Sequence, residues 1–161
     1  MFIRALMAFL ILPCVVAGLI PMLLAYLDPW RGHGFHFSGI SVMGLGLLVL
    51  LWCVRDFYVS GRGTLAPWDP PKHIVIVGLY RFSRNPMYIG VLTLIGGWVL
   101  HAGSPLLVCY LLLSAIVFHL RVIRYEEPWL SKTFGIEWTS YCAITPRWLP
   151  GFGVKRQLPH K

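Results

Sequence analysis

The sequence predicts an all-α integral membrane protein with about four transmembrane helices and a cytoplasmic interfacial helix towards the C-terminus. Composition supports this fold class, since 57% of the 161 residues are hydrophobic, 12% are charged and the mean hydropathy is +0.70. A soluble domain carries about 25% charged residues. The apolar residues also gather in long segments, and the 14 Lys and Arg residues cluster between and after those segments. At this length we expect a single domain over residues 1–161.

The first two apolar segments are each long enough to cross a bilayer as a helix, which takes about 20 residues. Residues 5–27 contain no charged side chain, and residues 37–58 begin with a second uncharged run. Arg4 resembles the start of a signal peptide, but the apolar run exceeds the roughly 7–15 residues of a signal core and no cleavage motif follows. We therefore expect a retained helix, kinked at Pro13 and Pro21, whose freed carbonyls neighbouring helices satisfy.

The third apolar run, residues 86–118, is too long for a single helix. It is interrupted at residues 101–105, where Gly, Ser and Pro favour a turn. We predict two helices, over residues 86–101 and 104–124. The first is short, and a re-entrant pair is the alternative to two full spans. Apolar and aromatic side chains further on predict an amphipathic interfacial helix over residues 128–142.

Positive charge orients the chain across the membrane. Lys and Arg are frequent between the second and third helices and after the fourth, whereas the first connection holds only Asp28 and Arg31. The positive-inside rule therefore places the basic segments and both termini in the cytoplasm. Topology also explains the net charge of +8, so we expect contact with anionic membrane lipids rather than with nucleic acid.

The four cysteines and six histidines form no recognisable metal-binding or disulfide pattern. Cys14, Cys53 and Cys109 lie in apolar runs, where cysteine behaves as a small hydrophobic residue, and Cys142 lies in the tail. No paired-histidine zinc motif and no glycine-rich dinucleotide motif is present. We expect neither a bound metal nor a Rossmann-type cofactor site.

Two motifs stand in the polar parts of the chain. Residues 78–90 read GLYRFSRNPMYIG, and residues 125–141 read YEEPWLSKTFGIEWTSY, with PRWLP at 146–150. In this order and at this distance they resemble the isoprenylcysteine carboxyl methyltransferase family and the related phospholipid N-methyltransferases, over roughly residues 60–150. Asn85 stands where the eukaryotic pattern has histidine, and the R-N-P form is usual in the bacterial branch.

The resemblance implies a multi-pass enzyme of the bacterial inner membrane, with its active site on the cytoplasmic side. It implies S-adenosylmethionine as methyl donor, S-adenosylhomocysteine as product, and a lipophilic acceptor that arrives from the bilayer. The positions that match the family motifs are Arg84 and Glu127 as catalytic residues, and Tyr80, Asn85, Pro86, Tyr88, Gly90, Glu126 and Glu127 as cofactor-binding residues.

The chemistry of the donor suits several of these side chains. A carboxylate, from Glu126 or Glu127, suits the donor's ammonium group. Arg84 suits the donor carboxylate or the acceptor, because a guanidinium binds carboxylates through two hydrogen bonds. The aromatic faces of Tyr88 and Trp148 suit the sulfonium cation.

Each of these positions also has a purely structural explanation. Asn85 and Pro86 suit the first turn of a helix without any ligand, with the Asn side chain as cap. Gly90 suits close helix packing. Glu127 lies three residues after Arg124, so a local ion pair is an alternative.

Three classes of function follow, of which a methyltransferase acting on a lipid-like or isoprenoid acceptor is favoured. The transfer is an in-line displacement at carbon, for which the protein supplies alignment and excludes water. A carboxyl acceptor needs no base, whereas an amine must lose a proton, and a thiol acceptor is also open. The alternative is a non-catalytic scaffold or lipid-binding relative. A small transporter is disfavoured, because the predicted helix interiors lack acidic and basic residues.

Overall fold

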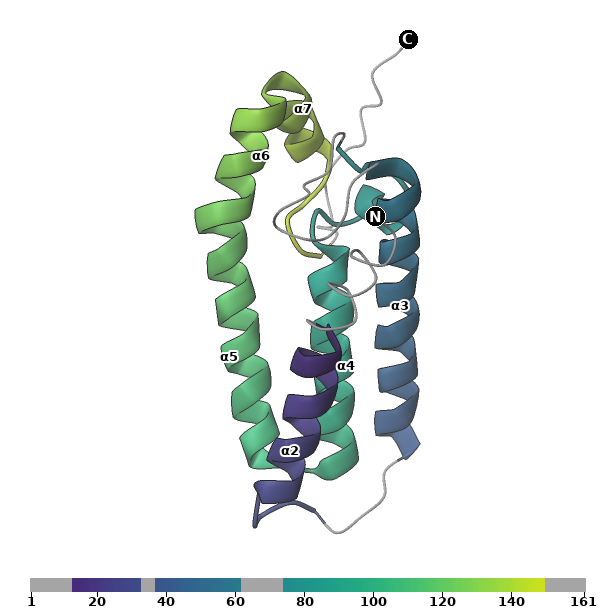
Figure 1. Ribbon diagram of the computed structural model, residues 1–161, viewed down its shortest axis with the longest axis vertical. Helices are drawn as coiled ribbons and strands as arrows, with labels where there is room; N and C mark the ends of the chain where they lie inside the picture. The colour runs from purple at the N-terminus through teal and green to yellow at the C-terminus, as the bar shows by residue number, and fades with distance from the viewer. Residues whose placement is uncertain (1–12, 33–36, 62–73, 150–161) are drawn as a thin grey trace.

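The computed structural model of the chain describes residues 13–32, 37–61 and 74–149. In these ranges all regular structure is helical, and the long helices run side by side along the long axis of the molecule (Figure 1). In chain order the elements are η1 (Val15–Leu19), α2 (Ile20–Leu27), α3 (Phe37–Gly61), η2 (Gly78–Arg81), α4 (Pro86–Ala102), α5 (Pro105–Arg121), η3 (Val122–Glu126), α6 (Glu127–Phe134) and α7 (Ile136–Ile144).

Two helical segments in the described part of the chain are long and apolar enough to cross a membrane, Phe37–Asp56 and Pro105–Phe134. Val15–Leu27 and Pro86–Ala102 are shorter apolar helices. Large apolar side chains are exposed along the outer faces of α3 and α5, among them Leu45, Leu48, Leu112, Leu113 and Ile116. Exposed apolar surface on this scale is typical of a protein that faces lipid or a partner rather than water.

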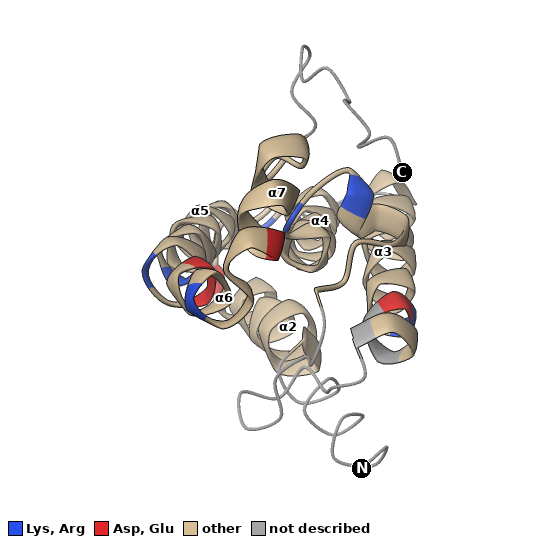
Figure 2. Cartoon of the chain, turned by 90° about the horizontal axis from the view of Figure 1, so that it is seen from above, with Lys and Arg blue, Asp and Glu red and all other residues tan. Residues whose placement is uncertain are grey.

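Helix α4 is the centre of the bundle, in contact with α3, α5, α2 and η1 (Figure 2). Glycines allow α3 and α4 to touch through their backbones. A Cβ atom added to Gly39 would lie 2.7 Å from the Gly97 carbonyl oxygen, and one added to Gly46 would lie 2.9 Å from the Gly90 carbonyl oxygen. Small residues that let two backbones approach in this way are a common device of membrane helices.

The first helix has its backbone carbonyls satisfied by other helices, as expected for proline in an apolar helix. Pro21 has no N–H to give to the Ala17 carbonyl, and the π-helical turn of η1 leaves the Val16 carbonyl without its usual donor. The Trp98 indole nitrogen donates to the Ala17 oxygen at 3.0 Å, and the Tyr110 hydroxyl donates to the Val16 oxygen at 2.8 Å. These bonds attach the first helix to α4 and α5.

Replacing Trp98 by phenylalanine is expected to lower the free energy of unfolding by about 1–3 kcal/mol, because the buried Ala17 carbonyl loses its donor. Changing Pro21 to alanine restores an N–H in the same turn and should recover part of the loss. Chemical unfolding in detergent, followed by circular dichroism for both single variants and the double variant, measures the coupling. A Trp98 effect that Pro21→Ala leaves unchanged would contradict this assignment.

At the end of the bundle away from α7, Asp28 joins the loop after α2 to the turn between α4 and α5. Its carboxylate accepts hydrogen bonds from the Ser104 hydroxyl, from Trp30 N at 2.9 Å and from Leu106 N at 3.1 Å. The bonds from Ser104 and Trp30 lower the pKa of the Asp28 carboxyl. Gly103 adopts φ 57°, which ends α4 and makes the predicted turn. This end fixes how α4 and α5 lie together.

The structure differs from the expectation after the fourth apolar segment. We predicted a helix over 104–124 and a separate interfacial helix over 128–142, but α5 continues through η3 and α6 to Phe134. Pro128 lies in the first turn of α6, where its missing N–H is tolerated after the π-helical turn. Gly135, at φ 52°, makes the break instead, and only α7 folds back over the bundle (Figure 1). The prediction of one interfacial helix over 128–142 was therefore wrong.

Candidate active site

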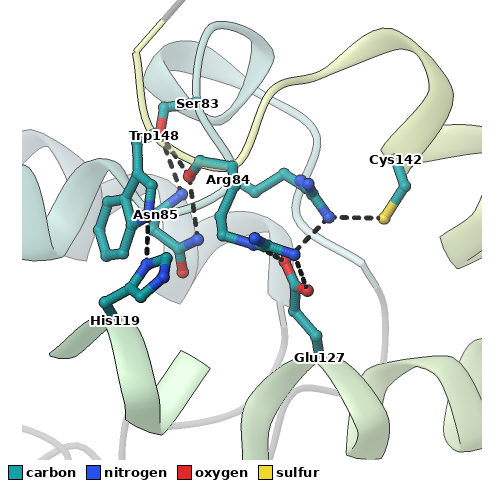
Figure 3. Close-up of polar contacts among 8 residues, drawn as sticks. Ser83, Arg84, Asn85, His119, Glu127, Cys142 and Trp148 are labelled. Atoms are coloured by element: carbon teal, nitrogen blue, oxygen red, sulfur yellow. Dashed lines mark hydrogen bonds and ion pairs between the residues drawn. The ribbon is translucent and has the colours of Figure 1, made fainter. Parts of the chain in front are cut away.

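The polar residues of the two motifs meet at one end of the bundle, where the start of α4 lies against η3, α6 and the segment after α7 (Figure 3). Arg84 and Asn85 immediately precede α4, and Glu127 begins α6. We call residues 146–148, which cross between these elements, the strap. The geometry thus brings together residues from both ends of the sequence resemblance.

Glu127 is held by two arginines from different parts of the chain. Its Oε1 atom lies 2.9 Å from Arg84 Nη1, and Arg147 donates from Nε to Oε1 at 2.8 Å and from Nη2 to Oε2 at 2.7 Å. The side chains of Glu127 and Arg84 are only 16% and 13% exposed, which strengthens the attraction. The local pair with Arg124 considered above is replaced by these long-range partners. The hydrogen bond to Glu127 raises the pKa of Arg147.

Arg84 is fixed from several directions and still has one unused donor. Its Nη1 atom donates to Cys142 Sγ at 2.9 Å, and its guanidinium lies 5.7 Å from the centre of the Trp138 ring. Its backbone N donates to the Pro146 carbonyl at 2.9 Å. Its Nε atom is buried without a hydrogen-bond partner among the described residues. A buried N–H of this kind is costly unless a ligand accepts from it.

Glu126 forms a second group beside the first. The Tyr88 hydroxyl donates to Glu126 Oε1 at 2.5 Å, and Arg121 Nε donates to the same oxygen at 2.9 Å. The Tyr88 ring lies 4.7 Å from the Phe118 ring and 6.4 Å from the Trp148 ring, measured between centroids. Glu126 ends the π-helical turn η3, a feature that is frequent at functional sites.

Asn85 occupies the N-cap position of α4 but does not cap it with its side chain. Its Nδ2 atom donates instead to the Arg147 carbonyl at 3.0 Å, and the Ser83 hydroxyl donates to the same carbonyl at 3.3 Å. On the other side of the strap, Trp148 Nε1 donates to His119 Nδ1 at 3.1 Å. The expected capping role of Asn85 was wrong, because its side-chain amide donates to the strap and makes no hydrogen bond to the first turn of α4. Pro86 does occupy the first turn of α4.

Three residues implied by the resemblance lie behind this group rather than in it. Gly90 packs against α3, where an added Cβ would lie 3.2 Å from the Gly46 carbonyl oxygen. Tyr80 is 8% exposed, its carbonyl accepts from the Tyr141 hydroxyl at 2.6 Å, and burial raises its pKa well above the usual value. Pro86 is buried at the start of α4. Their places are those of packing residues that position Arg84, Asn85 and Tyr88.

Sequence reasoning missed Arg147, Arg121 and Ser83 as members of the site. Arg147 lies in the quoted PRWLP motif, so a signal was present, but nothing in the local sequence points it towards Glu127. Arg121 contributed to the sequence analysis only as one of the positive charges that orient the chain in the membrane. The three arginines face two glutamates, which leaves one positive charge in excess. Such a group favours an anionic ligand atom, for example an amino-acid carboxylate.

The thiol of Cys142 offers a test of this packing. Burial raises its pKa, although Arg84 donates to the sulfur. Because the thiolate is the reactive form, we expect a water-soluble maleimide to modify Cys142 slowly near pH 8 and faster only above the usual thiol pKa of 9.0. The rate is measured in a variant with Cys14, Cys53 and Cys109 changed to alanine. Equal rates in folded and detergent-denatured protein would contradict the half-buried position of Cys142.

Among the residues that the structure describes, no three His, Cys, Asp or Glu side chains lie close enough to hold a metal ion. The side chains that meet at this end of the bundle are the arginines, glutamates and aromatic rings named above. They can fix an anion, present aromatic faces to a cation and exclude water.

Comparison with known proteins gives a family and one informative relative. The chain is 27% identical over 129 residues to the nickel-cobalt-cadmium resistance protein NccN of Alcaligenes xylosoxydans xylosoxydans, which covers 80% of this chain and 56% of NccN. The chain thus spans little more than half of that relative. No solved structure matches. A family model described as phospholipid methyltransferase matches residues 35–137, which include both glutamates and the whole 78–90 motif. The chain therefore belongs to the phospholipid methyltransferase family.

Proposed function

We propose that this protein is an S-adenosylmethionine-dependent methyltransferase that acts at the membrane on a lipid-like or isoprenoid acceptor. Membership of a methyltransferase family supports the kind of reaction. The observation that carries the proposal is the largely buried group of Arg84, Glu127 and Arg147, in which Arg84 Nε has no hydrogen-bond partner among the described residues.

The residues present fit the donor. Arg84 Nε has no hydrogen-bond partner among the described residues, so it can donate to the carboxylate of S-adenosylmethionine. The excess positive charge of the group attracts the same carboxylate. Tyr88 and Trp148 present aromatic faces suited to a sulfonium cation. When bound, S-adenosylmethionine supplies an activated methyl group. The task of these side chains is to orient it and to exclude water.

The same contacts bear on the choice of acceptor. Glu126 and Glu127 are both ion-paired with arginine, so neither is a free carboxylate. A carboxyl acceptor would need no base. An amine acceptor would deliver its proton to water or to another group. Both acceptor types, together with thiols, belong in the first screen.

The topology that we propose has four membrane segments, both termini and the active site in the cytoplasm of a bacterial cell. In this topology the shorter apolar helices Val15–Leu27 and Pro86–Ala102 cross the membrane in addition to the two long ones. The continuous Pro105–Phe134 helix has 30 residues, about 45 Å at 1.5 Å per residue. It therefore exceeds the roughly 30 Å hydrocarbon core, so that Glu126 and Glu127 would lie near the membrane surface, where basic side chains gather.

A second candidate function is that of a non-catalytic lipid-binding scaffold. The observation that favours it is that Glu127 already has both oxygens occupied by arginine, as in a purely structural ion pair. The two candidates differ in one property, since only the methyltransferase needs to bind the methyl donor.

Calorimetric binding of S-adenosylhomocysteine to the protein in lipid nanodiscs tests the proposal. We expect micromolar affinity, which an exposed control substitution on α7, Glu137→Gln, leaves unchanged. Labelled donor and lipid extracts then identify the acceptor. Well-folded protein that binds no S-adenosylhomocysteine in detergent or nanodiscs would overturn the proposal in favour of the scaffold.

A further inference from the structure

Outside the site described above, a buried carboxylate has an oxygen that no described residue contacts by a hydrogen bond. Asp56 lies near the end of α3 and is 9% exposed, and its Oδ2 atom has no hydrogen-bond partner among the described residues. Removing a lone charge from water is costly. In a chain of net charge +8, a buried carboxylate oxygen that no described residue contacts by a hydrogen bond is a candidate site for the cationic group of a ligand.

The backbone of Gly78 lies unusually close to the Asp56 carboxylate. Gly78 has φ 55°, and a Cβ atom there would collide with Asp56 Oδ2 and lie 3.1 Å from the Trp52 indole nitrogen. Glycine readily adopts this backbone conformation. Because Gly78 has no side chain, the Asp56 carboxylate and the Trp52 indole can both lie close to its backbone. Trp52 is 53% exposed, so one side of this corner is open. Cys53 and Tyr80, which belong to one buried cluster, both lie within electrostatic range of Asp56.

This corner adjoins the candidate active site. Gly78 begins η2, which leads within a few residues to Arg84. Tyr80 lies within electrostatic range of two acids, since after burial itself the charges of Asp56 and Glu126 contribute to raising its pKa. The Tyr80 carbonyl also holds Tyr141 of α7. Asp56 is therefore an acid at the back of the same end of the bundle.

The glutamates expected to bind an ammonium group are already neutralised. Glu127 contacts Arg84 and Arg147, and Glu126 contacts Arg121. Among the described residues at this end, Asp56 is a buried acid that makes no ion pair with a cation. We propose that Asp56, with Trp52 beside it, is the binding site for an ammonium group of a substrate of the methyl transfer, a proposal that rests on the function proposed above.

An organic ammonium fits this corner better than a metal ion does. Among the described residues Asp56 belongs to no group of three or more acidic, histidine or cysteine side chains that could hold a metal ion. One carboxylate together with a tryptophan ring is a common arrangement for recognising alkylammonium groups. Burial of Asp56 strengthens its attraction for a cation, because the local dielectric constant is lower than that of water. Two sources carry this chemistry, the α-ammonium of the donor and the amine of an acceptor.

The experiment compares wild type with Asp56→Asn in lipid nanodiscs and has two arms. The first arm measures the affinities of S-adenosylhomocysteine and of its analogue without the α-amino group. The second arm titrates ethylammonium chloride against equal sodium chloride and follows tryptophan fluorescence. Glu137→Gln is the matched control, because it removes an exposed negative charge from the same end of the molecule. Thermal unfolding without ligand checks the fold, and Asp56→Asn should be as stable as wild type or more so.

If the donor supplies the ammonium, wild type prefers S-adenosylhomocysteine over the analogue by about tenfold or more, and Asp56→Asn loses that preference. If an acceptor amine supplies it, Asp56→Asn loses only the response to ethylammonium. Wild type that binds S-adenosylhomocysteine while the folded variant matches it in both arms overturns the ammonium site and leaves the proposed function standing. Wild type that binds no S-adenosylhomocysteine overturns the proposed function, and this inference with it.

Discussion

Replacing Glu127 by glutamine is expected to abolish measurable binding of S-adenosylhomocysteine and to lower the free energy of unfolding by about 2–4 kcal/mol. The carboxylate neutralises Arg84 and Arg147, whose side chains are 13% and 34% exposed. Without it, two guanidinium groups would face each other with little water between them. Calorimetry measures the affinity, and chemical unfolding in detergent measures the stability.

Two further variants separate a role in binding from a role in folding. Glu126→Gln removes the neighbouring carboxylate, whose arginine partner is 51% exposed, and should cost less than about 1 kcal/mol of stability. Arg147→Met removes one of the two arginines that contact Glu127. In combination with Glu127→Gln it should recover part of the lost stability, because the two guanidinium groups then no longer repel each other. A folded Glu127→Gln protein that binds S-adenosylhomocysteine like wild type would mean that the ion pair is structural and lies outside the donor site.

Replacing Gly97 by alanine is expected to destabilise the protein by about 1–3 kcal/mol, the usual range for a forced extra methyl group in a packed interior. The added Cβ would lie 2.7 Å from Met43 N and 2.8 Å from the Gly39 carbonyl oxygen, both on α3. Backbone atoms cannot turn aside as a side chain can, so the helices would have to separate. Because α4 also begins at the candidate site, the same variant should weaken donor binding.

The chain offers matched controls for this variant. Gly96 and Gly44 lie in the same two helices, and a Cβ added to either meets nothing within 4 Å. Alanine at these positions should be neutral or stabilising by up to about 1 kcal/mol, because alanine is the better helix former. Unfolding midpoints of the variants in one detergent decide the question. Gly97→Ala as stable as Gly96→Ala would show that α3 and α4 do not touch there.

Much of the helical layout followed from the sequence. The helix expected over 86–101 is Pro86–Ala102, the one over 37–58 is Phe37–Gly61, and the turn between the third and fourth helices falls at Gly103. These features depend on uninterrupted apolar runs and on glycine or proline at their ends, which act over a few residues. The first twelve residues, and with them the start of the helix expected over 5–27, lie outside the described part.

The predictions that failed concern local rules that a more distant contact overrides. Apolar and aromatic side chains suggested a separate interfacial helix from residue 128, but α5 continues through the π-helical turn to Phe134. Asn85 has the sequence position of a cap, but its amide is used by the Arg147 carbonyl. In both places the energy at stake locally is small, about 1 kcal/mol for a cap, so that a tertiary contact decides the outcome.

By itself the sequence determined that the chain forms apolar helices, where its turns lie, and which two motifs carry polar chemistry. Only the tertiary structure decided which of 14 basic residues meet Glu126 and Glu127 and that Gly90 packs against α3. It alone also showed that Oδ2 of Asp56 has no hydrogen-bond partner among the described residues. The physical reason is the distance along the sequence over which each interaction acts. Helix formation satisfies backbone groups within one segment, whereas an ion pair is chosen by the arrangement in which several segments pack.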